Sequence, residues 1–142
     1  MSRLLVLVVS DNQTEVRVLS EILREQSRGE VSVVGAAGRG EDALSRAMAL
    51  RPHVILVNLD PAEEGDLEIL PRLRGLFVDV GIVALIAAEN GGLDEAARAA
   101  GADHAVVRSQ VRSHLASAVR QAAQKARARQ RVIDQSAMDL TP

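Results

Sequence analysis

Residues 33–60 read VVGAAGRGEDALSRAMALRPHVILVNLD. Two apolar, β-branched runs, Val31–Val34 and Val54–Val57, enclose a stretch with a helical pattern. Within that stretch four apolar side chains recur at intervals of three and four residues, so they share one helix face: Ala43, Leu44, Ala47 and Met48. The segment therefore predicts a strand, an amphipathic helix and a second strand.

The same alternation extends to both ends of the chain. Its apolar runs are continuous rather than alternating, which is typical of parallel strands covered on both faces. The further runs are Leu4–Val9, Ile82–Ala88 and Ala105–Val107, and helical patterns cover Thr14–Ser27, the region around Leu67–Leu73, Leu93–Ala100 and the chain from Val111 onward. We predict an α/β fold with a doubly wound, five-stranded parallel sheet in the order 2-1-3-4-5.

Composition narrows the class of protein. The chain has 142 residues, enough for one domain and a tail, and no cysteine, so a disulfide framework is excluded. No apolar run reaches the ~20 residues that span a bilayer, and we expect a cytoplasmic protein. Phe77 is the only aromatic residue, so platforms for stacking single-stranded nucleic acid are absent.

The functional site of such a sheet lies at the carboxyl ends of its strands. Polar or charged residues follow the first, third and fifth predicted strands, whereas apolar residues stand at the end of the fourth strand. The positions are Ser10–Asn12, Asn58–Asp60, Ile86–Ala87 and Arg108–Ser109. No glycine-rich loop follows the first strand, which argues against a dinucleotide or P-loop site.

Two segments resemble the receiver domains of chemotaxis and two-component response regulators. One is the segment 33–60, and the other is AGADHAVVRS at 100–109, similar to the turn that leads into the fifth receiver strand. The resemblance covers about residues 3–124 and implies the flavodoxin-like receiver fold.

The resemblance also implies what should stand at each site position. A receiver has two adjacent acids after the first strand, and here they are Ser10 and Asp11. The phosphoacceptor aspartate at the end of the third strand is Asn58. A Ser or Thr ends the fourth strand, a Lys the fifth, and an aromatic switch lies on the fifth; here these are Ile86, Arg108 and Ala105.

Taken together, these replacements remove the groups that phosphorylation of a receiver uses. An acylphosphate needs a carboxylate nucleophile, which the Asn58 amide is not. Mg²⁺ prefers several charged oxygen ligands, so we expect no cofactor and weak or absent Mg²⁺ binding, with Asp11 and Asp60 as weak candidates. We predict instead that Asp11 pairs with Arg108, whose planar guanidinium can hold a carboxylate. The chain is predicted not to be an enzyme.

The charge is unevenly distributed. Residues 1–103 carry 17 acids and 10 bases, a net −7, whereas 104–133 carry seven bases and no acid. We predict an atypical receiver domain at 1–124 and a basic helical extension at 125–142, either a linker to an output domain or a dimer helix. The extension continues a seam of Val111, Leu115, Val119, Ala122 and Ala126. Without acids at i+4, its cations are expected to need an acidic partner from another molecule.

The sequence thus predicts an atypical receiver acting by phosphorylation-independent protein–protein interaction. A homodimer is expected through the face of the fourth helix, fifth strand and fifth helix, with candidates Leu93, Ala97, Val111, Arg112 and Leu115. Two alternatives stay open. One is a working phospho-receiver that uses Asp60 or Asp11, and the other is the receiver part of an antiterminator-like regulator that binds nucleic acid. No membrane partner is expected.

Overall fold

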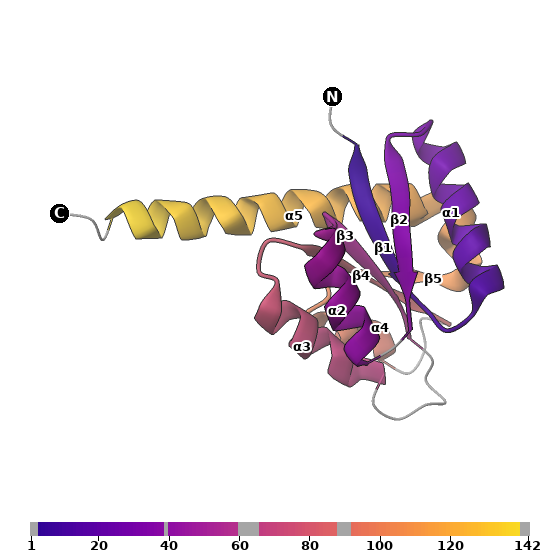
Figure 1. Ribbon diagram of the computed structural model, residues 1–142, viewed down its shortest axis with the longest axis horizontal. Helices are drawn as coiled ribbons and strands as arrows, with labels where there is room; N and C mark the ends of the chain where they lie inside the picture. Colours follow the sequence, from indigo (N-terminus) through magenta and orange to yellow (C-terminus); the bar gives the residue numbers. More distant parts are fainter. Residues whose placement is uncertain (1–2, 39, 60–65, 88–91, 140–142) are drawn as a thin grey trace.

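The computed structural model describes residues 3–38, 40–59, 66–87 and 92–139. Strands and helices alternate along the chain, and Figure 1 shows a central sheet with helices on both of its faces. The elements are β1 Leu4–Val9, α1 Gln13–Ser27, β2 Val31–Ala37, α2 Glu41–Leu50, β3 Val54–Asn58, η1 Asp66–Glu68, α3 Ile69–Leu76, β4 Gly81–Ile86, α4 Leu93–Ala100, β5 His104–Val107, η2 Arg108–Gln110 and α5 Val111–Asp139.

The sheet has five parallel strands in the order β2-β1-β3-β4-β5, which confirms the predicted topology. Helices α1 and α5 cover one face, and α2, α3 and α4 cover the other. The winding reverses between β1 and β3, so a crevice is expected at the carboxyl ends of these two strands.

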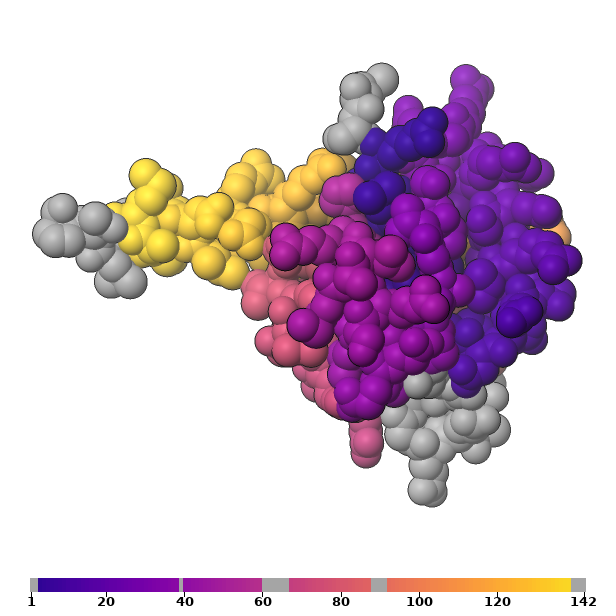
Figure 2. Space-filling model, viewed as in Figure 1, coloured from indigo at the N-terminus to yellow at the C-terminus, as the bar shows by residue number. Residues whose placement is uncertain are grey.

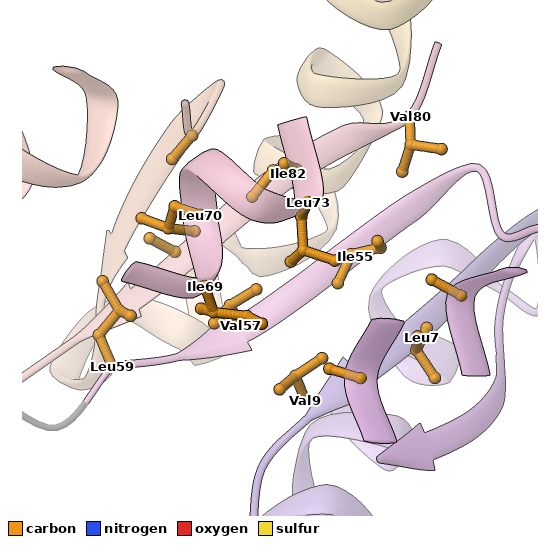
Figure 3. Packing of buried hydrophobic residues seen from close by; sticks show 14 of the residues in the cluster. Leu7, Val9, Ile55, Val57, Leu59, Ile69, Leu70, Leu73, Val80 and Ile82 are labelled. Atoms are coloured by element: carbon orange, nitrogen blue, oxygen red, sulfur yellow. The ribbon is translucent and has the colours of Figure 1, made fainter. Parts of the chain in front are cut away.

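The inner strands are buried on both faces. Leu7 of β1 and Ile55 of β3 are each 0% exposed, and burying such a side chain contributes about 1.5–3 kcal/mol. In Figure 3 the Leu73 side chain of α3 lies beside Ile55 and Ile82 of the sheet. Coverage from both sides explains why these strands are continuously apolar.

Two strand boundaries differ from the prediction. β2 continues three residues beyond the predicted run Val31–Val34, because Gly35 to Ala37 pair with the second half of β1. β4 ends at Ile86, whereas the apolar run predicts a strand that continues to Ala88, which lies outside the described residues.

Helix α2 buries a narrower face than the sequence predicts. Ala43, Leu44 and Ala47 are at most 6% exposed, but Met48 is 62% exposed. Ala47 lies at the middle of the buried stripe. Successive helical residues are about 100° apart, so Met48 lies about 100° round the helix from Ala47 and outside the stripe. The four side chains share one side of the helix, as the spacing predicts, but only Ala43, Leu44 and Ala47 are buried.

Helix α5 is continuous over 29 residues, so the helical pattern predicted from Val111 onward continues through the predicted basic extension. Leu115 and Ala122 are 0% exposed against the sheet, as the predicted seam requires. The helix crosses β4 closely, since a Cβ added at Gly81 would lie 2.7 Å from the backbone of Ala122. A glycine is therefore needed at this crossing.

A buried carboxylate holds α5 against the body. Asp103, whose side chain is 8% exposed, pairs with Arg129 of α5 and with Arg74 of α3, at 2.8 Å for the second pair. Its Oδ2 also accepts a hydrogen bond from the Ile82 N–H at 2.9 Å. Burial lowers the pKa of the Arg74 guanidinium, Asp103 raises it, and Arg129 lowers it. Asp103 thus offsets the desolvation of two cations.

Arg129 also ties α5 to the connection between α3 and β4. It donates hydrogen bonds to the carbonyls of Val78 and Val80, both at 3.0 Å. Helix α5 therefore contacts the body as far as Arg129, and the predicted boundary at 124–125 lies inside the helix. Beyond this point α5 projects from the body, as Figure 2 shows.

Three of the seven cations at 104–133 pair with an acid of the same chain, so the expectation that they need an acid from another molecule is wrong for these three. Arg108 pairs with Glu15, Arg120 with Glu30 at 3.4 Å, and Arg129 with Asp103, while Lys125 donates to the Asp103 carbonyl at 2.8 Å. The other three, Arg112, Arg127 and Arg131, form no ion pair with a described residue.

Among the described helices, none is long and apolar enough to cross a membrane.

Candidate functional site

The predicted site residues converge at the carboxyl ends of the strands. Asn58 is the last residue of β3, Ser10 follows β1, and Arg108 follows β5. The structure brings these three side chains into one hydrogen-bonded group, together with Glu15 from the first turn of α1. The parallel topology accounts for this, because strand ends far apart in sequence meet at one edge.

Asn58 is hydrogen bonded at both ends of its amide. Its Nδ2 donates to Oε2 of Glu15 at 2.8 Å and to Oγ of Ser10 at 3.4 Å. Its Oδ1 accepts a hydrogen bond from Arg108. The amide is therefore oriented with its oxygen toward the cation and its nitrogen toward the carboxylate.

Arg108 and Glu15 form an ion pair beside Asn58. The Nη1 of Arg108 binds Oε1 of Glu15, while its Nη2 binds Asn58. The side chains are 36% and 17% exposed, respectively, so the pair is partly shielded from water. One guanidinium thus links the end of β5 to both α1 and β3, and the charges of the pair cancel.

Glu15 was not among the residues predicted for the site, although a local signal marks it. Asn12 and Glu15 have the N-cap and N3 spacing of a capping box, and the Asn12 Oδ1 accepts from the Glu15 N–H at 3.0 Å. In a full capping box the Glu side chain would bind the N–H of the cap residue. Here that N–H donates to Ser10 Oγ at 3.1 Å instead. The Glu15 carboxylate is thereby left to bind Asn58 and Arg108.

The predicted ion pair between Asp11 and Arg108 is wrong, because Arg108 takes its carboxylate from Glu15. Asp11 is exposed, and its Oδ1 lies 2.9 Å from where a Cβ on Gly38 would stand. It thus faces the β2 side of the site. There it lines an open groove of about 400 Å³ between the ends of β1 and β2, together with Ser10 and Gln13.

The two switch equivalents offer no polar group. Ile86 ends β4 and is 1% exposed. Ala105 is half-buried in β5, paired with Ala84. Neither side chain can donate a hydrogen bond. Asp60, predicted as a weak metal candidate and alternative acceptor, lies outside the described residues.

Two oxygens at the strand ends already face a cation. Asn58 Oδ1 and Glu15 Oε1 both accept hydrogen bonds from the Arg108 guanidinium. In the described part of the chain, no cluster of three or more His, Asp or Glu side chains could hold a metal ion.

Of the five predicted interface residues, two cannot serve. Ala97 and Leu115 are each 0% exposed because they pack in the two cores on either side of the sheet. Leu93 and Val111 are half-buried, and Arg112 is exposed.

No family model matches the chain. Two curated relatives do, both named protein-glutamate methylesterase/protein-glutamine glutaminase. The protein from Clostridium acetobutylicum is 25% identical over 93 residues, which is 66% of this chain. The second, from Methanosarcina acetivorans, is 41% identical over 68 residues, or 47% of this chain. The chain spans 26% and 18% of the lengths of these relatives.

Solved structures match most of the chain. The response regulator domain of Thermotoga maritima CheB has a TM-score of 0.73 at 24% identity, covering 86% of this chain and 97% of that domain. The NarL signal receiver domain from Mycobacterium tuberculosis also has a TM-score of 0.73, at 22% identity, covering 87% and 98%.

The sheet order, the helices on both faces and these structural matches define the fold class: the chain has the fold of response-regulator receiver domains. The two curated relatives add sequence similarity over part of the chain.

Proposed function

We propose that this protein is an atypical receiver of a two-component or phosphorelay-type pathway, located in the cytoplasm, that acts through protein–protein contacts without being phosphorylated. In this proposal it has no enzymatic activity of its own and does not use Mg²⁺. The observation that carries the proposal is the position of Asn58 between Glu15 and Arg108, with both ends of its amide hydrogen bonded.

The chemistry of these groups opposes phosphoryl transfer. The acceptor must be an anionic nucleophile, whereas Asn58 is neutral and its oxygen already accepts from Arg108. An incoming phosphoryl group would also meet the negative charge of Glu15, which lies 2.8 Å from the Asn58 nitrogen. Like charges at this range repel strongly in a partly buried site.

Arg108 also supplies the positive charge that a metal ion would otherwise provide at this site. Arg108 is a permanent cation, and its partner Glu15 neutralises it within the same chain. The arrangement of the site then depends neither on metal concentration nor on a kinase. We infer a receiver held in one state, whose surface is constantly available to a partner.

The proposal includes self-association through the surface of α4, β5 and α5. Since Ala97 and Leu115 are buried, the predicted residues that remain available are Leu93, Val111 and Arg112. Light scattering at low and high salt tests this part, with Arg112→Glu expected to weaken the dimer because it reverses an exposed charge at the interface.

The test of the central proposal is incubation with acetyl phosphate and Mg²⁺ followed by intact mass spectrometry. An ordinary receiver treated in parallel gains one phosphoryl group, and we expect this chain to gain none. A clean gain that disappears in Asp60→Ala or in Asp11→Asn would establish the phospho-receiver alternative.

The nucleic-acid alternative is tested separately. Tight binding to duplex DNA or hairpin RNA that falls steeply with salt and is lost in Arg127→Ala/Arg131→Ala would favour it. We expect only weak binding with no dependence on these two arginines.

A further inference from the structure

Strand β2 forms one edge of the sheet, and no described strand pairs with its outer side. It is the longest of the described strands, with seven residues from Val31 to Ala37. An open groove of about 680 Å³ lies beside it, between α1 and residues 33–36. An apolar edge strand of this length is a template on which a strand of another molecule can pair.

The two edges of the sheet differ in how they are protected from such pairing. The opposite edge strand, β5, has only four residues, and a short edge strand gives a second chain little to pair with. Longer edge strands are commonly protected by charged side chains, by proline or by a β-bulge. Because β2 contains neither a charged residue nor a proline, protection of this kind has to come from its backbone.

The pairing of β2 with β1 contains one extra residue. Leu4 to Val6 pair with Val31 to Val33, and Leu7 to Val9 pair with Gly35 to Ala37. Val34 lies between the two paired segments and has no partner residue in β1, so it forms a β-bulge. It is also the only residue of β2 that is exposed, at 37%.

The side chains next to Val34 give independent evidence for the extra residue. Val33 packs against the core on the α1 face of the sheet, whereas Ala37 packs in the core on the α2 face. Gly35 also faces α2, since a Cβ added there would lie 2.7 Å from Cδ1 of Leu50. In an unbroken strand Val33 and Gly35 would face the same side, because side chains alternate with a period of two. Val34 therefore shifts the alternation by one residue.

The bulge limits what the edge can bind. It leaves three residues in regular register on each side and bends the strand between them. Strands of about three residues are the shortest in globular proteins, so neither half of β2 offers a second strand a long run of main-chain hydrogen bonds. With the extra residue removed, six residues of β2 would be in continuous register.

We propose that the Val34 bulge is a protective device, which keeps the β2 edge of one molecule from pairing with the β2 edge of a second copy. Without the bulge, two β2 strands would pair antiparallel across a two-fold axis, and this pairing would bring no like charges together because the strand carries none. The inference goes beyond the proposed function, since it concerns the edge of the sheet that the proposed self-association does not use.

The test is the deletion of Val34 from the full chain in the Arg112→Glu background, in which the self-association proposed above is weakened. Both halves of β2 keep their partners in β1, so we expect this variant to fold with an unchanged far-ultraviolet circular dichroism spectrum. At about 100 µM protein, light scattering should give a mean mass about twice that of the undeleted protein or more, because unprotected strand edges associate in this concentration range.

Two matched variants separate the bulge from other causes. Val34→Gly keeps the extra residue and removes only its exposed side chain, so it should leave the mass unchanged. Ser32→Lys, added to the deletion, places a charge on the regularised edge strand. It should return the mass to that of the undeleted protein, because lysine on an edge strand opposes pairing.

Several results would overturn this inference. They are a folded deletion variant with the mass of the undeleted protein, an increase in mass that Ser32→Lys does not reverse, and an increase that Val34→Gly reproduces. Failure of the deletion to fold, both alone and with a glycine inserted after Gly38 to restore the chain length, would also overturn it, because the bulge would then be required for the fold itself. Phosphorylation by acetyl phosphate would remove the proposed function and leave the result at this edge unchanged.

Discussion

The guanidinium of Arg108 and the carboxylate of Glu15 form an ion pair across 93 positions of the chain. The pair joins the residue after β5 to the first turn of α1, and Asn58 at the end of β3 binds both partners. Where a receiver would present carboxylates to Mg²⁺, this chain has a group in which an amide lies between opposite charges. Its consequences for stability and metal binding can be measured.

A double-mutant cycle with Glu15→Gln and Arg108→Met should give a coupling free energy of about 1 kcal/mol in urea unfolding. This is the upper range for exposed pairs, because the Glu15 side chain is only 17% exposed and Arg108 36%. The matched control is the pair of Asp42 and Arg46, which are 3.8 Å apart and 55% and 54% exposed. Its coupling should be below about 0.3 kcal/mol. Equal couplings in the two cycles would show that the site pair is not a stabilising contact.

Asp103→Asn should lower the free energy of unfolding by about 2–4 kcal/mol, because it leaves two partly buried guanidinium groups without their carboxylate. Chemical denaturation in urea measures the loss. Glu30→Gln is the control, since Glu30 is 61% exposed and lies 3.4 Å from Arg120. That change should cost under about 0.5 kcal/mol. A mild effect of Asp103→Asn would mean that α5 is held by its apolar seam alone.

Gly81→Ala should destabilise the fold by about 1–3 kcal/mol, because the new methyl group would lie 2.7 Å from the Ala122 backbone and force α5 away from β4. Gly75→Ala is the matched change, since a Cβ at Gly75 in α3 meets no atom within 4 Å. It should be neutral or stabilise by up to about 1 kcal/mol. Thermal unfolding compares the two. The same sign for both would contradict the close crossing of α5 over β4.

The stability lost on shortening α5 should depend sharply on where the helix is cut. A chain ending after Gln130 retains the contacts of Arg129 and should unfold within about 0.5 kcal/mol of the full chain. A chain ending after Ala122 loses Arg129 and the buried Ala126, and should lose about 3 kcal/mol or more. Circular dichroism during urea unfolding measures both. A gradual loss of stability with each residue removed would show that Arg129 contributes no more than its neighbours in α5.

Mg²⁺ should barely stabilise the protein. A site with a Kd of about 1 mM would add roughly 1.4 kcal/mol at 10 mM metal. We expect less than about a quarter of that, because Arg108 already binds the oxygens of Asn58 and Glu15. Differential scanning fluorimetry with and without the metal measures the shift. A full-sized shift that Asp11→Asn abolishes would show a working metal site.

The fold could be read from the sequence because its signals are local and periodic. Continuous apolar runs and helical spacing predict the strands and helices, and chain connectivity then restricts the parallel sheet to a few orders. The positions of Ser10, Asn58 and Arg108 at the strand ends follow from that topology. The continuity of α5 follows from a segment without glycine or proline.

Side-chain partners required the three-dimensional arrangement. Spacing cannot tell which of Asp11 and Glu15 binds Arg108. That choice depends on Ser10 taking the Asn12 N–H and on the direction in which α1 leaves β1. The apolar pattern of α2 likewise does not reveal that Met48 lies beyond the edge of the buried stripe. Asp103 binds two arginines because Arg74 of α3 and Arg129 of α5 both reach it, although they lie 29 and 26 positions away in the sequence. Ion pairs and exposed patches depend on which non-local groups compete for the same hydrogen bonds and space, and a linear pattern does not contain that information.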